Sequence, residues 1–145
     1  MQTAHRHPLA GQSGFTLVEL LVVVLIIGIL SAIAVPAFLN QRSKSQDAEA
    51  KVYLVAGQKA MAIWHQEHDT FAGATMEDLI EIDDALAHAR NPTVEGDEDT
   101  YTLEFDSASG SRGGGSFTLK RNADETFDRT CANAGKGACS DTGRW

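Results

Sequence analysis

The chain has 145 residues, 43% of them hydrophobic, and a formal net charge of −8, which together favour one domain of modest size. The charge is unevenly placed, because residues 67–106 carry thirteen acidic side chains and a single basic one, Arg90. Binding to nucleic-acid phosphates requires a dense basic patch, so this distribution argues against direct nucleic-acid binding.

Residues 15–39 form an apolar run in which Glu19 is the one charged residue. As a helix, this run would extend about 37 Å at 1.5 Å per residue, which exceeds the roughly 30 Å of a hydrocarbon core. The sequence therefore predicts a membrane-spanning helix close to the N-terminus.

A short polar segment, residues 1–14, precedes the apolar run and ends in Gly14. A secretory signal peptide is cut after its apolar region, at small residues, and the residues that follow Pro36 offer no convincing site of that kind. The Gly14–Phe15 bond is the better candidate. Cleavage there would remove the leader and keep the apolar helix.

Glu19 is a carboxylate inside an apolar run, which is unfavourable by a few kcal/mol on insertion scales. Cleavage after Gly14 would free an amine on Phe15, four residues away and on the same helix face. In an assembly, that amine of one subunit could pair with Glu19 of a neighbour. The alternative interpretation is an acid that is tolerated at the membrane interface.

Gly28 and Pro36 interrupt the helical pattern of the same run. Glycine lowers helix stability, and proline removes a backbone hydrogen bond, although membrane helices tolerate both. The two residues predict either a kinked span or a segment that loosens when subunits pack together.

Residues 40–68 are predicted to continue the helix, because apolar side chains recur at steps of three and four. The expected apolar face comprises Ala48, Val52, Tyr53, Val55, Ala56, Ala60, Ile63 and Trp64. Joined to the apolar run, this gives one helix of about 54 residues, roughly 80 Å long. A small soluble domain cannot bury such a rod.

The remainder of the chain predicts a short helix and a small sheet. Thr75 and Asp78 suggest the N-cap of a helix over residues 76–88, which Asn91 and Pro92 would end. Residues 99–106 and 116–122 alternate apolar and polar side chains and predict an antiparallel hairpin, with residues 126–129 as a possible third strand. The glycines at 113–115 are interpreted as a turn, since no Gly-Lys-Ser/Thr follows them.

The two cysteines, Cys131 and Cys139, are too few for a four-ligand zinc site. In a chain that enters the membrane they predict an extracytoplasmic disulfide, with two free thiols as the alternative. In the chain-entropy model, so short a loop contributes about 2–3 kcal/mol.

No pattern in the chain predicts a catalytic site, so neither an enzyme activity nor a cofactor is expected. His65 and His68 could share a metal, but a solvated helix end is the favoured interpretation. Hard oxygen ligands that suit calcium are closely spaced at Glu95, Asp97, Glu98 and Asp99. Their spacing does not fit an EF-hand, and the alternative is an ordinary acidic loop.

The segment GFTLVELLVVVLIIGILSAIAVPAFLNQ resembles the N-terminal signature of type IV pilins and their pseudopilin relatives. The resemblance is close over residues 14–41, with Gly14, Phe15, Glu19, Gly28 and Pro36 at the matching places. The tail, RTCANAGKGACSDTGRW, is similar to the cysteine-bounded C-terminal loop of some pilins, including those of Gram-positive actinobacteria.

The resemblance implies an α+β fold in which a long N-terminal helix packs on a small antiparallel sheet with a C-terminal disulfide loop. It implies that a prepilin peptidase removes the leader, residues 1–14, and methylates the amine of Phe15. Residues 15–39 would then be the transmembrane and polymerisation helix. Residues 40–145 would form the periplasmic or extracellular pilin domain.

The same resemblance implies a structural subunit of a type IV pilus or related filament, with Glu19 ordering the register of the subunits. The expected partners are identical or related pilin subunits and an inner-membrane assembly platform. The protein would be a single-pass cytoplasmic membrane protein before assembly and part of a surface filament afterwards. The alternatives are a pseudopilin of a type II secretion or DNA-uptake system and a minor pilin with an adhesive or ligand-binding role.

Overall fold

A computed structural model describes residues 14–145 and divides the chain into two compact units, one that ends at Pro36 and one that spans Ala37–Trp145. Helix α1 (Leu17–His68) begins in the first unit and ends in the second. The leader prediction concerns residues 1–14, of which residues 1–13 lie outside the described part. The two units are considered separately below.

The described part of the first unit consists of helix from Leu17 onward, and its side chains are exposed throughout. Large apolar residues such as Val18, Leu30 and Ile33 remain at least 62% exposed. Within the described residues, α1 is long and apolar enough to cross a membrane, by length and composition. A surface of this kind is stable only in lipid or against other apolar helices.

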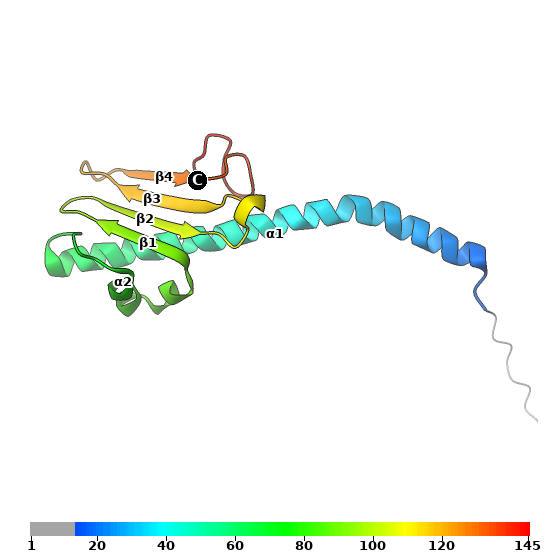
Figure 1. Cartoon of the computed structure of the whole chain (residues 1–145), viewed down its shortest axis with the longest axis horizontal. Helices are drawn as coiled ribbons and strands as arrows, with labels where there is room; N and C mark the ends of the chain where they lie inside the picture. Colours follow the sequence, from blue (N-terminus) through cyan, green and yellow to red (C-terminus); the bar gives the residue numbers. More distant parts are fainter. Residues whose placement is uncertain (1–13) are drawn as a thin grey trace, which may run out of the picture. The chain divides into compact units, whose positions relative to one another are not determined.

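The second unit is an antiparallel sheet that lies along one side of the C-terminal half of α1 (Figure 1). Its four strands follow chain order as β1 (Arg90–Gly96), β2 (Tyr101–Asp106), β3 (Ser116–Arg121) and β4 (Phe127–Cys131). In register, Leu103 of β2 lies opposite Leu119 of β3, and Phe105 lies opposite Phe117. All four side chains are fully buried, so the alternation of residues fixes which face meets the helix.

Three of these strands agree with the sequence prediction, and β1 is the strand that the prediction missed. Asn91 and Pro92 suggested the end of a helix, but they lie inside β1, where the register with β2 is irregular between Arg90 and Thr93. Proline is tolerated here because β1 is an edge strand, with one side free of ladder hydrogen bonds.

The predicted helix over residues 76–88 is divided in two. Helix α2 (Met76–Ile82) begins with the expected cap, where Thr75 and Asp78 exchange hydrogen bonds in a capping box. The chain then turns at Asp83, whose side chain caps the short 3₁₀ helix η1 (Asp84–His88). Leu79 and Leu86 insert into the core from these two segments.

The apolar face predicted for residues 40–68 is partly wrong. The buried positions of α1 are Ser43, Asp47, Ala50, Leu54, Gly57, Ala60 and Met61. Ala48, Val52, Val55 and Ile63 were expected on the packed apolar face, but they are exposed. The helix packs through a narrower stripe of mainly small side chains, because the sheet approaches it closely.

Gly57 is a point of close approach between α1 and the sheet. A Cβ atom at this position would lie 3.0 Å from Cδ1 of Leu103 and 3.5 Å from the ring of Phe105. Both neighbours are fully buried and cannot move toward solvent. Glycine therefore sets the distance at which the helix and the sheet pack.

We expect Gly57→Val to lower the free energy of unfolding by about 1–3 kcal/mol, because the branched side chain overpacks this contact. The matched control is Ala48→Val on the exposed side of the same helix, which should change stability by less than about 0.5 kcal/mol. Denaturant unfolding of the detergent-solubilised full chain measures both. Equal effects of the two variants would contradict the close-packing argument.

Candidate functional site

The N-terminal end of α1 brings together the residues that the sequence singled out. Gly14 precedes the helix with nothing within 4 Å of its Cβ position, and Phe15 is 83% exposed. Glu19 lies in the first turn, where its Oε2 atom accepts hydrogen bonds from the backbone N–H and the hydroxyl of Thr16, at 3.4 and 3.5 Å. The backbone N–H of Glu19 donates to Oγ1 of Thr16 in return, at 3.2 Å.

These reciprocal bonds form a capping box, with Thr16 as the N-cap and Glu19 three residues later. The carboxylate is thereby satisfied within its own chain at the positive end of a helix dipole. Sequence reasoning found Glu19 but missed Thr16, although the Thr-Leu-Val-Glu spacing is the signal for this motif. The prediction that Glu19 pairs with an amine concerns a second copy of the chain and stays a prediction.

Gly28 and Pro36 lie within α1, as expected for the two interruptions of the apolar run. Among residues 14–145, nothing lies within 4 Å of a Cβ atom placed at Gly28, so no contact in that part of the chain requires a glycine there. Pro36 is the last residue of the first compact unit. Their predicted role in loosening the helix during assembly stays a prediction.

Asp47 is the principal polar feature of the second unit and is fully buried on the face of α1 that meets the sheet domain. Its Oδ1 atom accepts hydrogen bonds from the hydroxyls of Ser107 and Ser109, at 2.6 and 2.5 Å. Its Oδ2 atom accepts from the backbone N–H groups of Gly114 and Ala138, both at 2.8 Å. Four donors from two separate loops therefore converge on one carboxylate.

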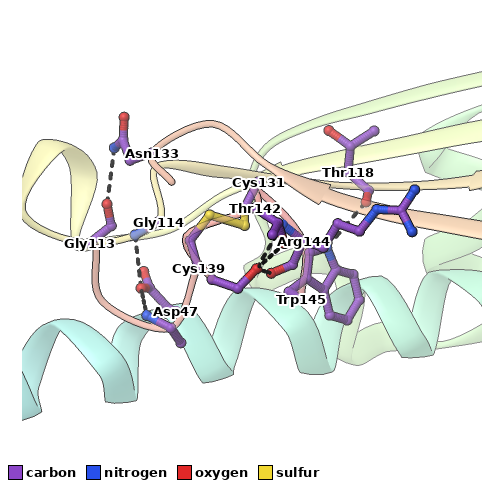
Figure 2. The surroundings of a disulfide bond; sticks show 12 residues. Asp47, Gly113, Gly114, Thr118, Cys131, Asn133, Cys139, Thr142, Arg144 and Trp145 are labelled. Atoms are coloured by element: carbon purple, nitrogen blue, oxygen red, sulfur yellow. Dashed lines mark hydrogen bonds between the residues drawn. A yellow bond between two sulfur atoms is a disulfide. The ribbon is translucent and has the colours of Figure 1, made fainter. Parts of the chain in front are cut away.

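The first of these loops connects β2 to β3 and contains the short 3₁₀ helix η2 (Gly110–Arg112). The second is the loop closed by the disulfide, and Figure 2 shows it beside α1, with Asp47 next to Gly114. Lys51, one turn along α1, donates to the carbonyl oxygen of Ala138 at 2.6 Å. The backbone of Ala138 is therefore bound at both polar groups: its N–H donates to Asp47, and its C=O accepts from Lys51.

Burial of Asp47 acts to raise the pKa of its carboxyl group, but the hydrogen bonds from Ser107, Ser109, Ala138 and Gly114 together outweigh it. The pKa is lowered from the ordinary value of 3.8, so the group is ionised at neutral pH. Burial lowers the pKa of Lys51, and the nearby charge of Asp47 partly opposes this shift. An ionised carboxylate is the better acceptor for four donors at once.

Cys131 and Cys139 form the predicted disulfide, with their Cα atoms 5.8 Å apart (Figure 2). Within the loop, Gly137 has a φ of 57°, and a Cβ atom there would lie 2.0 Å from Oδ2 of Asp47. Glycine is required because the backbone passes directly over the carboxylate. The bond and the glycine together bring the Ala138 N–H to its acceptor.

The candidate calcium ligands do not converge. Glu95 belongs to β1, and Asp97, Glu98 and Asp99 lie in the turn before β2. The side chain of Asp97 accepts from the backbone N–H of Glu98 at 2.9 Å. Residues 14–145 contain no group of three or more His, Cys, Asp or Glu side chains that could hold a metal ion.

The two histidines at the end of α1 make aromatic contacts with different residues. His65 packs on Phe71, with ring centroids 4.5 Å apart, and His68 stacks on Trp64 at 3.7 Å. The Nδ1 atom of His68 also lies 3.0 Å from the carbonyl oxygen of Trp64. The two side chains thus contact different aromatic neighbours at the C-terminal end of α1.

The long N-terminal helix, the four-stranded antiparallel sheet and the C-terminal disulfide form the α+β fold of the pilins. The family described as "Prokaryotic N-terminal methylation motif" matches residues 9–35, which include the junction at Gly14 and Phe15.

Type IV pilins are among the relatives in sequence. The chain is 46% identical to the type IV major pilin protein PilA of Myxococcus xanthus over 59 residues, which are 41% of this chain and 27% of that protein. It is 52% identical to the type IV major alpha-pilin of Moraxella bovis over 50 residues, or 34% and 31% of the two chains. A fimbrial protein of Neisseria meningitidis serogroup B is 41% identical over 63 residues, 43% of this chain and 36% of that one. The matches thus span about a third of these relatives' length.

We expect Asp47→Ala to lower the free energy of unfolding by about 3–5 kcal/mol, because it leaves two backbone N–H groups and two hydroxyls without an acceptor. Asp47→Asn should cost only about 1–2 kcal/mol. Its oxygen can still accept from Gly114 and Ala138, and the serine hydroxyls can rotate to accept from its NH₂ group. Glu49→Ala, an exposed acid on the same helix, is the control and should be nearly neutral.

The two Asp47 variants should also differ from the wild type in pH dependence. Because folding lowers the pKa of Asp47, its stabilising contribution is complete above the unfolded value of 3.8 and is lost as the pH falls through the lower folded value. Asp47→Asn lacks this contribution, so the stability gap to the wild type should narrow in acid. A gap that is independent of pH would contradict the ionised-carboxylate assignment.

Proposed function

We propose that the protein is a structural subunit of a type IV pilus or a closely related filament. The observation that carries the proposal is the N-terminal methylation motif on a helix whose apolar surface is exposed in the isolated chain. Packing against the same helix of other copies would bury this surface. The relatives named as major pilins and fimbrial proteins favour a pilus subunit over a pseudopilin or an adhesive minor pilin.

In this proposal residues 1–14 are a leader that a prepilin peptidase removes, and the same enzyme methylates the new amine of Phe15. Residues 15–39 then hold the protein in the cytoplasmic membrane until an inner-membrane assembly platform adds it to the filament. Residues 40–145 lie on the outer side, where a disulfide can form and persist. The exposure of Gly14 and Phe15 supports access by a peptidase.

We expect the mature protein to begin at Phe15 and to carry one additional methyl group. Intact-mass and N-terminal peptide spectrometry of the membrane fraction measures both. Replacing Gly14 with a bulky residue, as in Gly14→Val, should leave the uncleaved precursor, whereas Gly28→Ala, a glycine change inside the helix, should be processed normally. A mature N-terminus at Met1 or beyond Leu39 would exclude this processing.

The proposed work of Glu19 depends on its two possible partners. In the single chain, Thr16 satisfies the carboxylate through the capping box. In a filament, the charged amine of a neighbouring Phe15 would offer a stronger, charge-assisted bond. A subunit added in the wrong register would leave that amine and the carboxylate apart in an apolar surrounding, so the pairing favours one axial offset.

We expect Glu19→Val to insert and to be cleaved normally but to reduce surface fibres by at least about tenfold, a loss on the scale of one buried charge pair. Glu19→Asp should be intermediate, because its side chain is shorter. The variants are expressed as the only copy, and sheared fibres are quantified beside the cell-bound protein. Thr16→Ala is the control that removes the capping partner and keeps the charge. Wild-type amounts of fibre from Glu19→Val would refute the pairing role.

A further inference from the structure

Four exposed basic side chains gather at the end of the second unit where the apolar run of the sequence stops. Arg42 and Lys44 lie on α1, Arg112 ends η2, and Lys136 belongs to the disulfide loop. These four residues are called the basic collar below. Arg42 and Lys44 flank Ser43, the first buried residue of the helix stripe.

Two hollows join three of the four collar residues to Leu39, the last apolar residue of the run, and Lys44 lines neither hollow. One, of about 150 Å³, is lined by Leu39, Arg42 and Arg112 together with Ser43, Gln46, Ala108 and Ser109. The other, of about 350 Å³, is lined by Leu39, Arg112 and Lys136. Each hollow thus combines an apolar wall with one or more cationic groups.

Within the described residues, none of the collar charges takes part in an ion pair. Among residues 14–145 the ion pairs within 4.0 Å join Arg121 to Glu125 and Arg144 to Asp128, and neither includes a collar residue. Lys136 donates only to the carbonyl oxygen of Ser111, at 3.3 Å. Asp47, buried beneath the same loops, already accepts four hydrogen bonds from other groups.

The same buried carboxylate holds the collar in place. Ser109 and Gly114, on either side of Arg112, donate to Asp47. Ala138, two residues after Lys136, donates to it as well. The cations on the two loops are therefore fixed beside α1 rather than carried on free segments, which lowers the entropy that binding an anion would cost.

We propose that the basic collar binds the phosphate groups of anionic phospholipids at the membrane surface, with Leu39 against the acyl region. The proposal rests on the membrane anchoring proposed above. Basic residues immediately beyond a span oppose transfer of that side across the membrane. Arg42 and Lys44 stand within five residues of the apolar run, on the side that we assign to the exterior. Attraction between these charges and anionic headgroups would offset the unfavourable transfer of basic residues across the membrane.

The test uses the full chain, reconstituted in phosphatidylcholine nanodiscs with and without phosphatidylglycerol. Native mass spectrometry after release from the discs counts the lipids of each kind that stay bound. A lysine or arginine near an anionic surface contributes about fivefold in affinity. The collar variant, Arg42→Gln with Lys44→Gln, Arg112→Gln and Lys136→Gln, should therefore lower retention of phosphatidylglycerol relative to phosphatidylcholine by at least about tenfold.

The matched control carries Lys59→Gln, Arg90→Gln, Lys120→Gln and Arg144→Gln, four exposed cations elsewhere in the domain. It has the same net charge as the collar variant and should keep the wild-type preference. Equal retention by the collar variant and the wild type would overturn the proposal. So would loss of the preference on adding inorganic phosphate at constant ionic strength, since the collar would then be a site for free phosphate.

The amount of surface fibre from cells that express each variant distinguishes lipid binding from a contact between subunits. It also tests the filament function separately from the lipid site. If the collar variant keeps its lipid preference but loses fibres, the collar binds acidic side chains of a second copy, and the lipid assignment is wrong. If the wild type forms no fibres yet prefers phosphatidylglycerol through the collar, the filament function fails and the lipid site stands.

Discussion

The domain depends on the burial of one ionised carboxylate, that of Asp47. A charge that is removed from water is very unfavourable unless its hydrogen bonds are replaced, and here four donors replace them. Those donors lie on the β2–β3 loop and on the disulfide loop, neither of which has regular structure beyond a single 3₁₀ turn. The acceptor on α1 therefore ties both loops to the helix, in addition to the backbone hydrogen bonds that each loop makes within itself.

The two parts of α1 meet different requirements in one continuous sequence. From Leu17 to Pro36 the side chains are mostly apolar, and this apolar surface is not buried against the rest of the described chain. Beyond Pro36, small residues such as Ala50 and Gly57 let the sheet approach, and Asp47 provides a specific anchor. The polar contact in the first part, between Thr16 and Glu19, is local in sequence. The polar contacts in the second part, between Asp47 and its loop donors, are long-range.

The features that could be predicted from the sequence are those encoded by local pattern. The helix over the apolar run, the alternation in β2 and β3, the Thr75 cap and the cysteine pair are all confirmed. Strand β1 was missed because Asn and Pro residues commonly mark the end of a helix or strand. Asn91 and Pro92 belong to a strand here because the segment pairs with β2. Asp47 has no local signature, since it resembles any polar residue on a helix. Its burial follows from donors 60 to 91 residues further along the chain.

In the membrane topology proposed above, this separation along the chain has a consequence for the export of the domain. Ala138 is 91 residues beyond its acceptor on α1, so the domain cannot close while that region is still on the inner side. Until then the carboxylate remains hydrated and the helix stripe has no sheet against it. Contacts of such long range form late and slowly. In that topology, the exported segment would remain unfolded until the disulfide loop has crossed the membrane.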